Sequence, residues 1–107
     1  MLLFIDTTST RIIIQVNGTK VKKTIQSPRG EDILKLIEVV LKKANVTKEK
    51  LTEIEVNPGP GPSIDLNVGV AVANALGTSL KIPVNRQKPG VFVKPIYKES
   101  PNTNGKS

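Results

Sequence analysis

The sequence predicts an α/β domain in which a mixed sheet of five strands is covered by two main helices. Of its 40 apolar residues, 32 are Ile, Val or Leu, and the aromatic residues are two Phe and one Tyr. Aliphatic and β-branched side chains of this kind pack well in a sheet covered by helices. The 107 residues suffice for one domain, which buries about two thirds of its unfolded surface around a single core.

Three strands are expected at the beginning of the chain. Residues 2–6 and 11–16 are apolar runs of strand length, and residues 20–25 alternate between polar and apolar side chains. Asn17-Gly18 separates the second run from the third, and both residues tolerate the positive φ of a two-residue hairpin turn. The pattern predicts an antiparallel meander whose lysine-rich third strand is a protected outer edge.

The first helix is predicted over residues 31–44. Acidic residues occupy its first turn and lysines its last, and Asn45 follows where the chain must leave helical geometry. At helical spacing, one narrow stripe is apolar: Ile33, Ile37, Val40, Leu41 and Ala44. Leu36 and Val39 fall outside that stripe. They are either peripheral core residues or a second apolar face for a partner.

A strand at 53–56, a second helix at 64–79 and a fifth strand at 82–84 follow. The alternation of strands and helices implies right-handed crossovers and the strand order 3-2-1-4-5. The second helix is apolar nearly all round, so both of its sides need covering. On this helix Gly69, Ala73 and Gly77 recur every four residues and predict a smooth ridge that another helix could approach closely.

Composition excludes several kinds of site. There is no His and no Cys, so disulfides, a thiol nucleophile, the usual zinc ligands and an imidazole base are excluded. Carboxylates remain the candidate general bases, and we expect no catalytic residue, no metal and no cofactor. No apolar run has the length of a membrane span, and the first residues lack the basic region of a signal peptide. A cytoplasmic protein without membrane contact is expected.

The basic residues are concentrated near the C-terminus. The net charge is +7, and residues 86–107 contribute +4 of it, from five basic groups and one acidic group. We divide the chain into an α/β domain at 1–85 and a basic tail at 86–107. Within the tail, residues 91–97 could form one more extended segment, whereas residues 100–107 have the composition of a disordered end.

Two loops have residues that could bind phosphate. Hydroxyls and backbone amides cluster in the turn after the first strand, where a carboxylate could also hold a hydrated Mg²⁺; its residues are Asp6, Thr7, Thr8, Ser9 and Thr10. A simple polar turn is the favoured interpretation and a nucleotide site the alternative. The loop at 58–62 precedes the second helix, but its three prolines remove amide donors. For this loop a rigid corner is favoured over a phosphate cradle.

Together these segments resemble the N-terminal domain of the TsaB (YeaZ) family. The resemblance rests on residues 5–10, the helix at 31–44, residues 56–71 and residues 80–84. The family's loop and second helix usually read V-G-R-G-P-G-S-F-T-G-L-R-I-G-V-A, which aligns without a gap. Identical positions are Val56, Gly59, Pro60, Gly61, Leu66, Gly69, Val70 and Ala71. Departures are Pro62, Ser63, Ile64, Asp65 and Asn67, and we expect the family's second domain to be missing, because residues 85–90 lead directly into the tail.

This resemblance implies a single actin-like ATPase (RNase H-like) domain and a non-catalytic role. TsaB-like proteins support the transferase TsaD when it makes threonylcarbamoyladenosine (t6A) on tRNA. They pair with TsaD or with themselves through the two helices, so tRNA is contacted indirectly. The expected interface comprises Leu36, Val39, Lys43, Gly69, Val70, Ala73 and Gly77. The alternatives are a nucleotide-binding half-domain that uses the Asp6–Thr10 turn and a small basic RNA-binding module.

Overall fold

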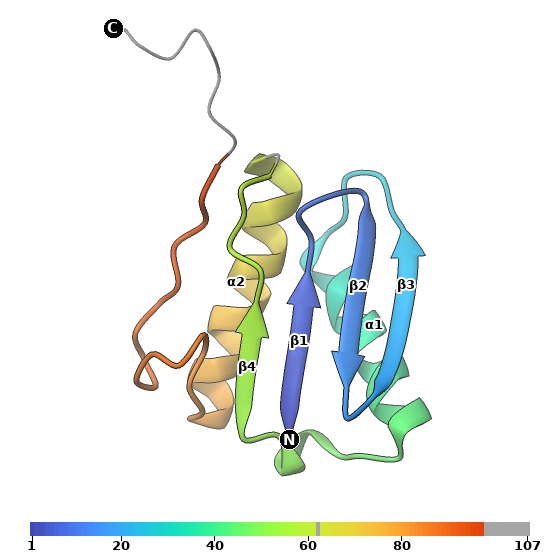
Figure 1. The fold of residues 1–107 in the computed structure, drawn as a ribbon, viewed down its shortest axis with the longest axis vertical. Helices are drawn as coiled ribbons and strands as arrows, with labels where there is room; N and C mark the ends of the chain where they lie inside the picture. The colour runs from blue at the N-terminus through green and yellow to red at the C-terminus, as the bar shows by residue number, and fades with distance from the viewer. Residues whose placement is uncertain (62, 98–107) are drawn as a thin grey trace, which may run out of the picture.

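A computed structural model describes residues 1–61 and 63–97 as two layers, a sheet and a pair of helices (Figure 1). The strands are β1 (Leu2–Asp6), β2 (Arg11–Val16), β3 (Thr19–Thr24) and β4 (Glu53–Val56), and the helices are α1 (Gly30–Ala44) and α2 (Ser63–Leu80). A short 3-10 turn at Lys48–Lys50 precedes β4. The four strands and two helices lie within two residues of their predicted bounds.

The N-terminal meander is confirmed. β1 pairs antiparallel with β2, which pairs antiparallel with β3, and β1 pairs parallel with β4. Asn17 and Gly18 form the hairpin turn at φ 48° and φ 84°, the left-handed values that the sequence pattern requires. The sheet order is β3-β2-β1-β4, so β3 and β4 are the outer strands.

The predicted fifth strand and the order 3-2-1-4-5 are wrong, because the sheet has four strands in the order 3-2-1-4. Of residues 82–84, Val84 makes an isolated parallel bridge to Ile54. Asn85 then takes φ 51° and turns the chain away from the sheet. Its side chain takes the place of the next backbone hydrogen bonds to β4. Asn85 Oδ1 accepts from the Val56 amide at 2.8 Å, and Nδ2 donates to the Val56 carbonyl at 2.9 Å.

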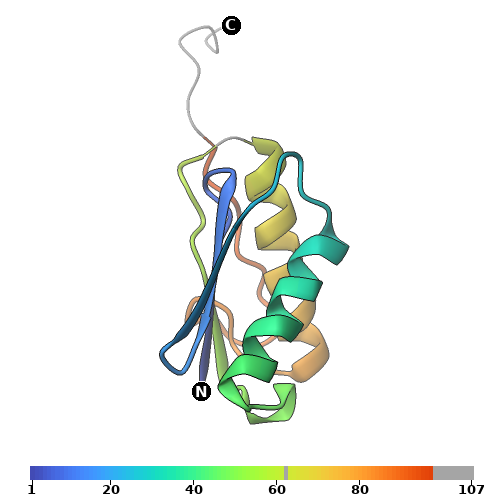
Figure 2. The ribbon, with the colours of Figure 1, turned by 90° about the vertical axis from the view of Figure 1, so that its right-hand side faces the viewer.

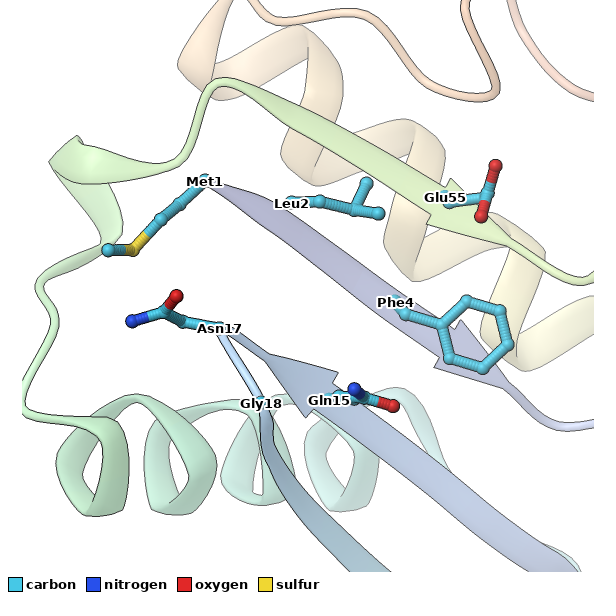
Figure 3. Close-up of a pocket in the computed structure, with 7 residues that line it drawn as sticks. All are labelled: Met1, Leu2, Phe4, Gln15, Asn17, Gly18 and Glu55. Atoms are coloured by element: carbon cyan, nitrogen blue, oxygen red, sulfur yellow. The ribbon is translucent and has the colours of Figure 1, made fainter.

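Both helices cover the same face of the sheet (Figure 2). The opposite face carries alternate strand residues, among them Leu2, Phe4, Gln15 and Glu55, and no described helix lies over it (Figure 3). Side chains alternate between the two faces of a strand. The buried neighbours Leu3, Ile5, Ile14, Ile54 and Val56 therefore point toward the helices.

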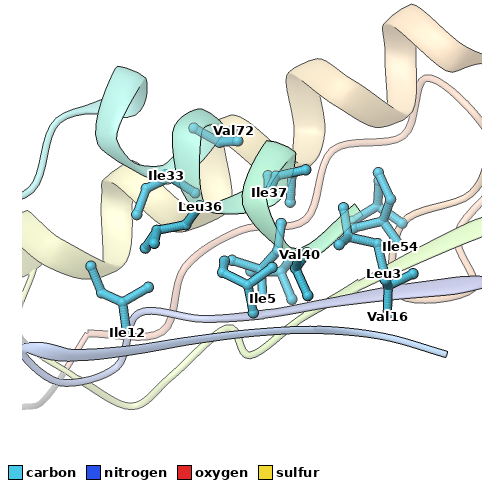
Figure 4. Close-up of a cluster of buried hydrophobic side chains, with 14 of the residues drawn as sticks. Leu3, Ile5, Ile12, Val16, Ile33, Leu36, Ile37, Val40, Ile54 and Val72 are labelled. Atoms are coloured by element: carbon cyan, nitrogen blue, oxygen red, sulfur yellow. The ribbon is translucent and has the colours of Figure 1, made fainter. Parts of the chain in front are cut away.

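The core lies between the sheet and the helix pair (Figure 4). α1 contributes Ile33, Leu36, Ile37, Val40 and Leu41 to it. Leu36 is 6% exposed, whereas Val39 is 42% exposed. Leu36 is thus a core residue, whereas Val39 remains at the surface, as does Leu34, which is 44% exposed. α2 adds residues that include Leu66, Val70 and Ala73.

The ends of α1 follow its sequence signals. The Asp32 carboxylate accepts a hydrogen bond from the Arg29 amide at 2.8 Å, one of the donors that the first turn of a helix leaves free. Acidic residues there and lysines in the last turn complement the helix dipole. Asn45 ends the helix at φ 57°, in the left-handed conformation that Asn tolerates.

The chain makes turns at residues 85–86 and 89–90, and residues 91–97 then run beside α2 as an extended segment (Figure 1). The Asn74 amide holds the segment at Val93, donating to its carbonyl and accepting from its N–H, both at 2.9 Å. Further along, the Ile96 amide donates to the Pro58 carbonyl at 2.5 Å. The predicted extended stretch at 91–97 is therefore packed on the domain. The stretch at 100–107 lies outside the described residues.

Candidate functional site

The turn after β1 uses its hydrogen-bond donors internally. The Asp6 Oδ1 accepts from the Thr8 amide at 2.9 Å and from the Thr8 hydroxyl at 2.6 Å. Ser9 Oγ accepts from the Arg11 amide at 3.2 Å and donates to the Arg11 carbonyl at 3.3 Å. An anion would have to displace a carboxylate of its own charge to reach the Thr8 donors. The geometry favours the polar-turn interpretation of residues Asp6 to Thr10.

Thr7, in the same turn, is a packing residue. Its side chain is fully buried and lies against Gly69 in α2, where a Cβ atom would come within 2.1 Å of Thr7 Oγ1. Within residues 1–61 and 63–97, Thr7 Oγ1 has no hydrogen-bond partner. It faces the helix and not an open cradle, so it does not contribute a free donor for phosphate.

The loop between β4 and α2 is held from both sides. The Asn57 amide donates to the Ile5 carbonyl at 2.9 Å, and Asn57 Nδ2 donates to Asp6 Oδ2 at 3.3 Å. The Gly59 amide donates to Asn57 Oδ1 at 3.2 Å, and Gly61 pairs with Tyr97 in an isolated parallel bridge. These contacts make the loop a fixed corner between strand and helix, as its prolines indicated.

The small-residue ridge on α2 packs against the chain itself. The Thr7 side chain packs against Gly69, and a Cβ atom on Gly77 would lie 2.3 Å from Val84 Cγ2. Ala73 is fully buried and Val70 is 2% exposed. The ridge does allow close approach, but what approaches is the turn after β1 and the segment after α2. In this fold it is not accessible to a helix of another protein.

The exposed residues of the helix pair are a different set. On α1 they include Leu34, Val39 and Lys43, and on α2 they include Asn67, Ala71, Ala75 and Thr78. Sequence reasoning missed Ala71 and Ala75 because it followed the row of Gly69, Ala73 and Gly77 on α2. It missed Leu34 because it considered Leu36 and Val39 as the apolar residues outside the buried stripe of α1. A usable signal was present: positions 67, 71, 75 and 78 form the least apolar stripe of an otherwise apolar helix.

The side chains described here do not form a metal centre. Within residues 1–61 and 63–97, no three His, Cys, Asp or Glu side chains gather closely enough to hold an ion. Neither helix of this part of the chain combines the length and apolarity that crossing a bilayer requires.

The comparisons with known proteins agree with this architecture. A family model described as "TsaD: tRNA N6-adenosine threonylcarbamoyltransferase" matches residues 24–86. Two solved structures match with a TM-score of 0.67 and 22% identity over 78% of this chain: YeaZ from Pseudomonas aeruginosa, and an uncharacterised protein similar to peptidase YeaZ from the same organism. This chain covers 41% and 40% of their lengths. No curated protein matches.

Proposed function

We propose, on the premise that this chain belongs to the family of the tRNA N6-adenosine threonylcarbamoyltransferase TsaD, that it takes part in forming t6A on tRNA. Its matched region, residues 24–86, spans α1, β4 and α2 and more than half of the chain. Within this pathway the chain acts as a non-catalytic subunit in the cytoplasm. It binds a TsaD-like protein, which carries the transferase chemistry and positions the tRNA.

The hydrogen bonding of Asp6 is the observation that favours a supporting role over a nucleotide site. Both Thr8 donors are bound to the Asp6 carboxylate, so ATP phosphates would have to compete with an attached anion of like charge. The composition also supplies no His and no Cys for acid–base or nucleophilic work. Calorimetry with Mg-ATP tests this preference, because micromolar binding to the isolated protein would favour the nucleotide half-domain instead.

The exposed side of the helix pair is the proposed contact surface for the TsaD-like protein. Val39 is 42% exposed and has Lys43 beside it one turn later. Ala71 and Ala75 are exposed and have small side chains, so a second pair of helices could approach α2 closely there. Buried residues lie beneath this surface and do not touch the partner; they are Leu36, Gly69, Val70, Ala73 and Gly77.

Charge placed on this surface tests the contact. Val39→Glu and Ala75→Glu introduce carboxylates at exposed positions, so the fold is expected to persist while co-purification with a TsaD-like protein and t6A formation are lost. Lys48→Glu in the exposed 3-10 turn is the control, and it should leave both readouts unchanged. Retention of the complex by both helix variants would refute the proposed surface.

A further inference from the structure

The open face of the sheet carries an apolar centre between two charged edges. Leu2 is 37% exposed, and Phe4 and Ile13 are half-buried on the side away from the helices. The register places Glu55, Phe4, Gln15 and Lys20 side by side in one row across all four strands. Each row position points to the same face, because directly paired residues share a side of the sheet.

Two neighbouring hollows lie along β1 on this face. A cavity of about 550 Å³ lies over β1 and is lined by residues that include Leu2, Phe4, Gln15 and Glu55 (Figure 3). A second hollow of about 390 Å³ shares Phe4 and Glu55 with the first and extends toward Asn85. The two form one shallow groove along β1 and β4, with the Phe4 ring at their junction.

The charges on the two edges are opposite in sign. β4 presents Glu53 and Glu55, whereas β3 presents Lys20 and Lys22. Among residues 1–61 and 63–97 the ion pair present is Arg29–Glu31, at the start of α1. The acidic edge and the basic edge are separated by the width of the sheet, so they do not neutralise each other within one chain.

We propose that this face binds a second copy of the chain, face to face, about a two-fold axis parallel to the strands. Such an axis reverses the strand order of the facing sheet, so that the Glu53 and Glu55 edge of each copy lies over the Lys20 and Lys22 edge of the other. The interface is isologous and every charged pair occurs twice. Leu2, Phe4 and Ile13 form its apolar centre, as in sheet-on-sheet packing.

The charge pattern selects this axis over the alternative. A two-fold axis perpendicular to the strands would place β4 over β4 and β3 over β3, and like charges opposed across an interface are strongly unfavourable. The pairing also leaves the exposed faces of α1 and α2 free. It therefore stands independently of the proposed contact with a TsaD-like protein, and either proposal can fail without the other.

Cysteine cross-linking of the whole chain tests the arrangement, because the chain has no Cys of its own. In the proposed pairing, positions 20 and 55 of the two copies face each other across about 10 Å, the spacing of packed sheets. An equimolar mixture of Lys20→Cys and Glu55→Cys proteins should therefore form the mixed 20–55 dimer with a bis-maleimide cross-linker that spans about 10 Å. Neither variant alone should form its 20–20 or 55–55 dimer to a comparable extent.

Charge reversal provides an independent readout by sedimentation. Glu55→Lys and Lys20→Glu should each weaken self-association about tenfold through like-charge repulsion, and the double variant should restore it. Lys48→Glu in the exposed 3-10 turn is the matched control and should have no effect. The proposal is overturned if the wild-type chain is monomeric or if 55–55 cross-linking predominates. It is also overturned if Lys43→Glu on α1 is the one variant that weakens self-association, or if the open face becomes protected only when a TsaD-like protein is added.

Discussion

Gly69 is where a single residue decides how closely sheet and helix pack. It lies in the interior of α2, a position at which Gly is normally unfavourable relative to Ala. The structure gives the reason, because a Cβ atom there would lie 2.1 Å from Thr7 Oγ1 and 2.9 Å from Thr7 Cβ. The turn after β1 and α2 are thus fitted to each other atom by atom, and the family-like motif at this position is explained by packing.

Gly69→Ala should therefore destabilise the protein despite the better helix propensity of Ala. We expect a loss of about 1–3 kcal/mol in the free energy of unfolding, the usual range for overpacking a core, measured by chemical denaturation. Gly30→Ala is the matched control, since its Cβ would meet Val72 Cγ2 at an ordinary 3.7 Å. Combining Gly69→Ala with Thr7→Ala should recover part of the loss, and no recovery would show that the contact is not responsible.

At the scale of the element, Asn85 determines where the sheet ends. Its φ of 51° turns the backbone away after one bridge, and its side chain takes both hydrogen-bonding groups of Val56. An edge strand otherwise exposes such groups to pairing with another chain. Asn combines the two properties required, tolerance of the left-handed conformation and an amide that imitates a peptide group.

Two substitutions separate these properties. Asn85→Ala loses both hydrogen bonds and the tolerance of positive φ, so it should cost about 2–3 kcal/mol of unfolding free energy. Asn85→Gly loses the hydrogen bonds but keeps the backbone freedom, and should cost about 1–2 kcal/mol. Hydrogen exchange at the Val56 amide should accelerate in both variants. Equal stability of both variants and wild type would contradict the role assigned to the side chain.

At the scale of the whole molecule, positive charge is displaced toward the segment beside α2. Arg86, Lys88 and Lys94 are all exposed in the described part of that segment, which is fastened by Asn74 at Val93. The basic groups are thus carried by packed chain and have a fixed place relative to the helix pair. If a TsaD-like protein holds tRNA, these groups add attraction for its phosphates.

Neutralising this segment should weaken tRNA binding by the complex in a salt-dependent way. Replacing Arg86, Lys88 and Lys94 with Gln removes charge while leaving the backbone contacts of the segment in place. The slope of log affinity against log salt should fall in magnitude by about two, given the usual contribution of each phosphate contact. Gln at Lys42, Lys48 and Lys50 removes equal charge elsewhere and serves as the control. An unchanged slope would refute an electrostatic role for the segment.

Much of the architecture was predictable because it depends on local chemistry. The meander followed from Asn17-Gly18 and the alternation around it, and α1 followed from its apolar stripe and from Asn45. The fifth strand was predicted wrongly, since a short apolar run looks the same whether it makes a full ladder or one bridge. The position of Leu36 was left open for a similar reason, because the width of the buried stripe depends on how α1 lies on the sheet.

The sequence by itself determined the two helices, four of the five strands it predicted, the aliphatic core, and the absence of His and Cys, since each is a property of residue types and their spacing. Only the tertiary structure decided which side chains pack against the small residues of α2, which groups the Asp6 carboxylate binds, and where residues 86–97 lie. These depend on contacts between residues distant along the chain, Thr7 with Gly69, Asp6 with Asn57 and Asn74 with Val93. Sequence spacing carries no record of such distances.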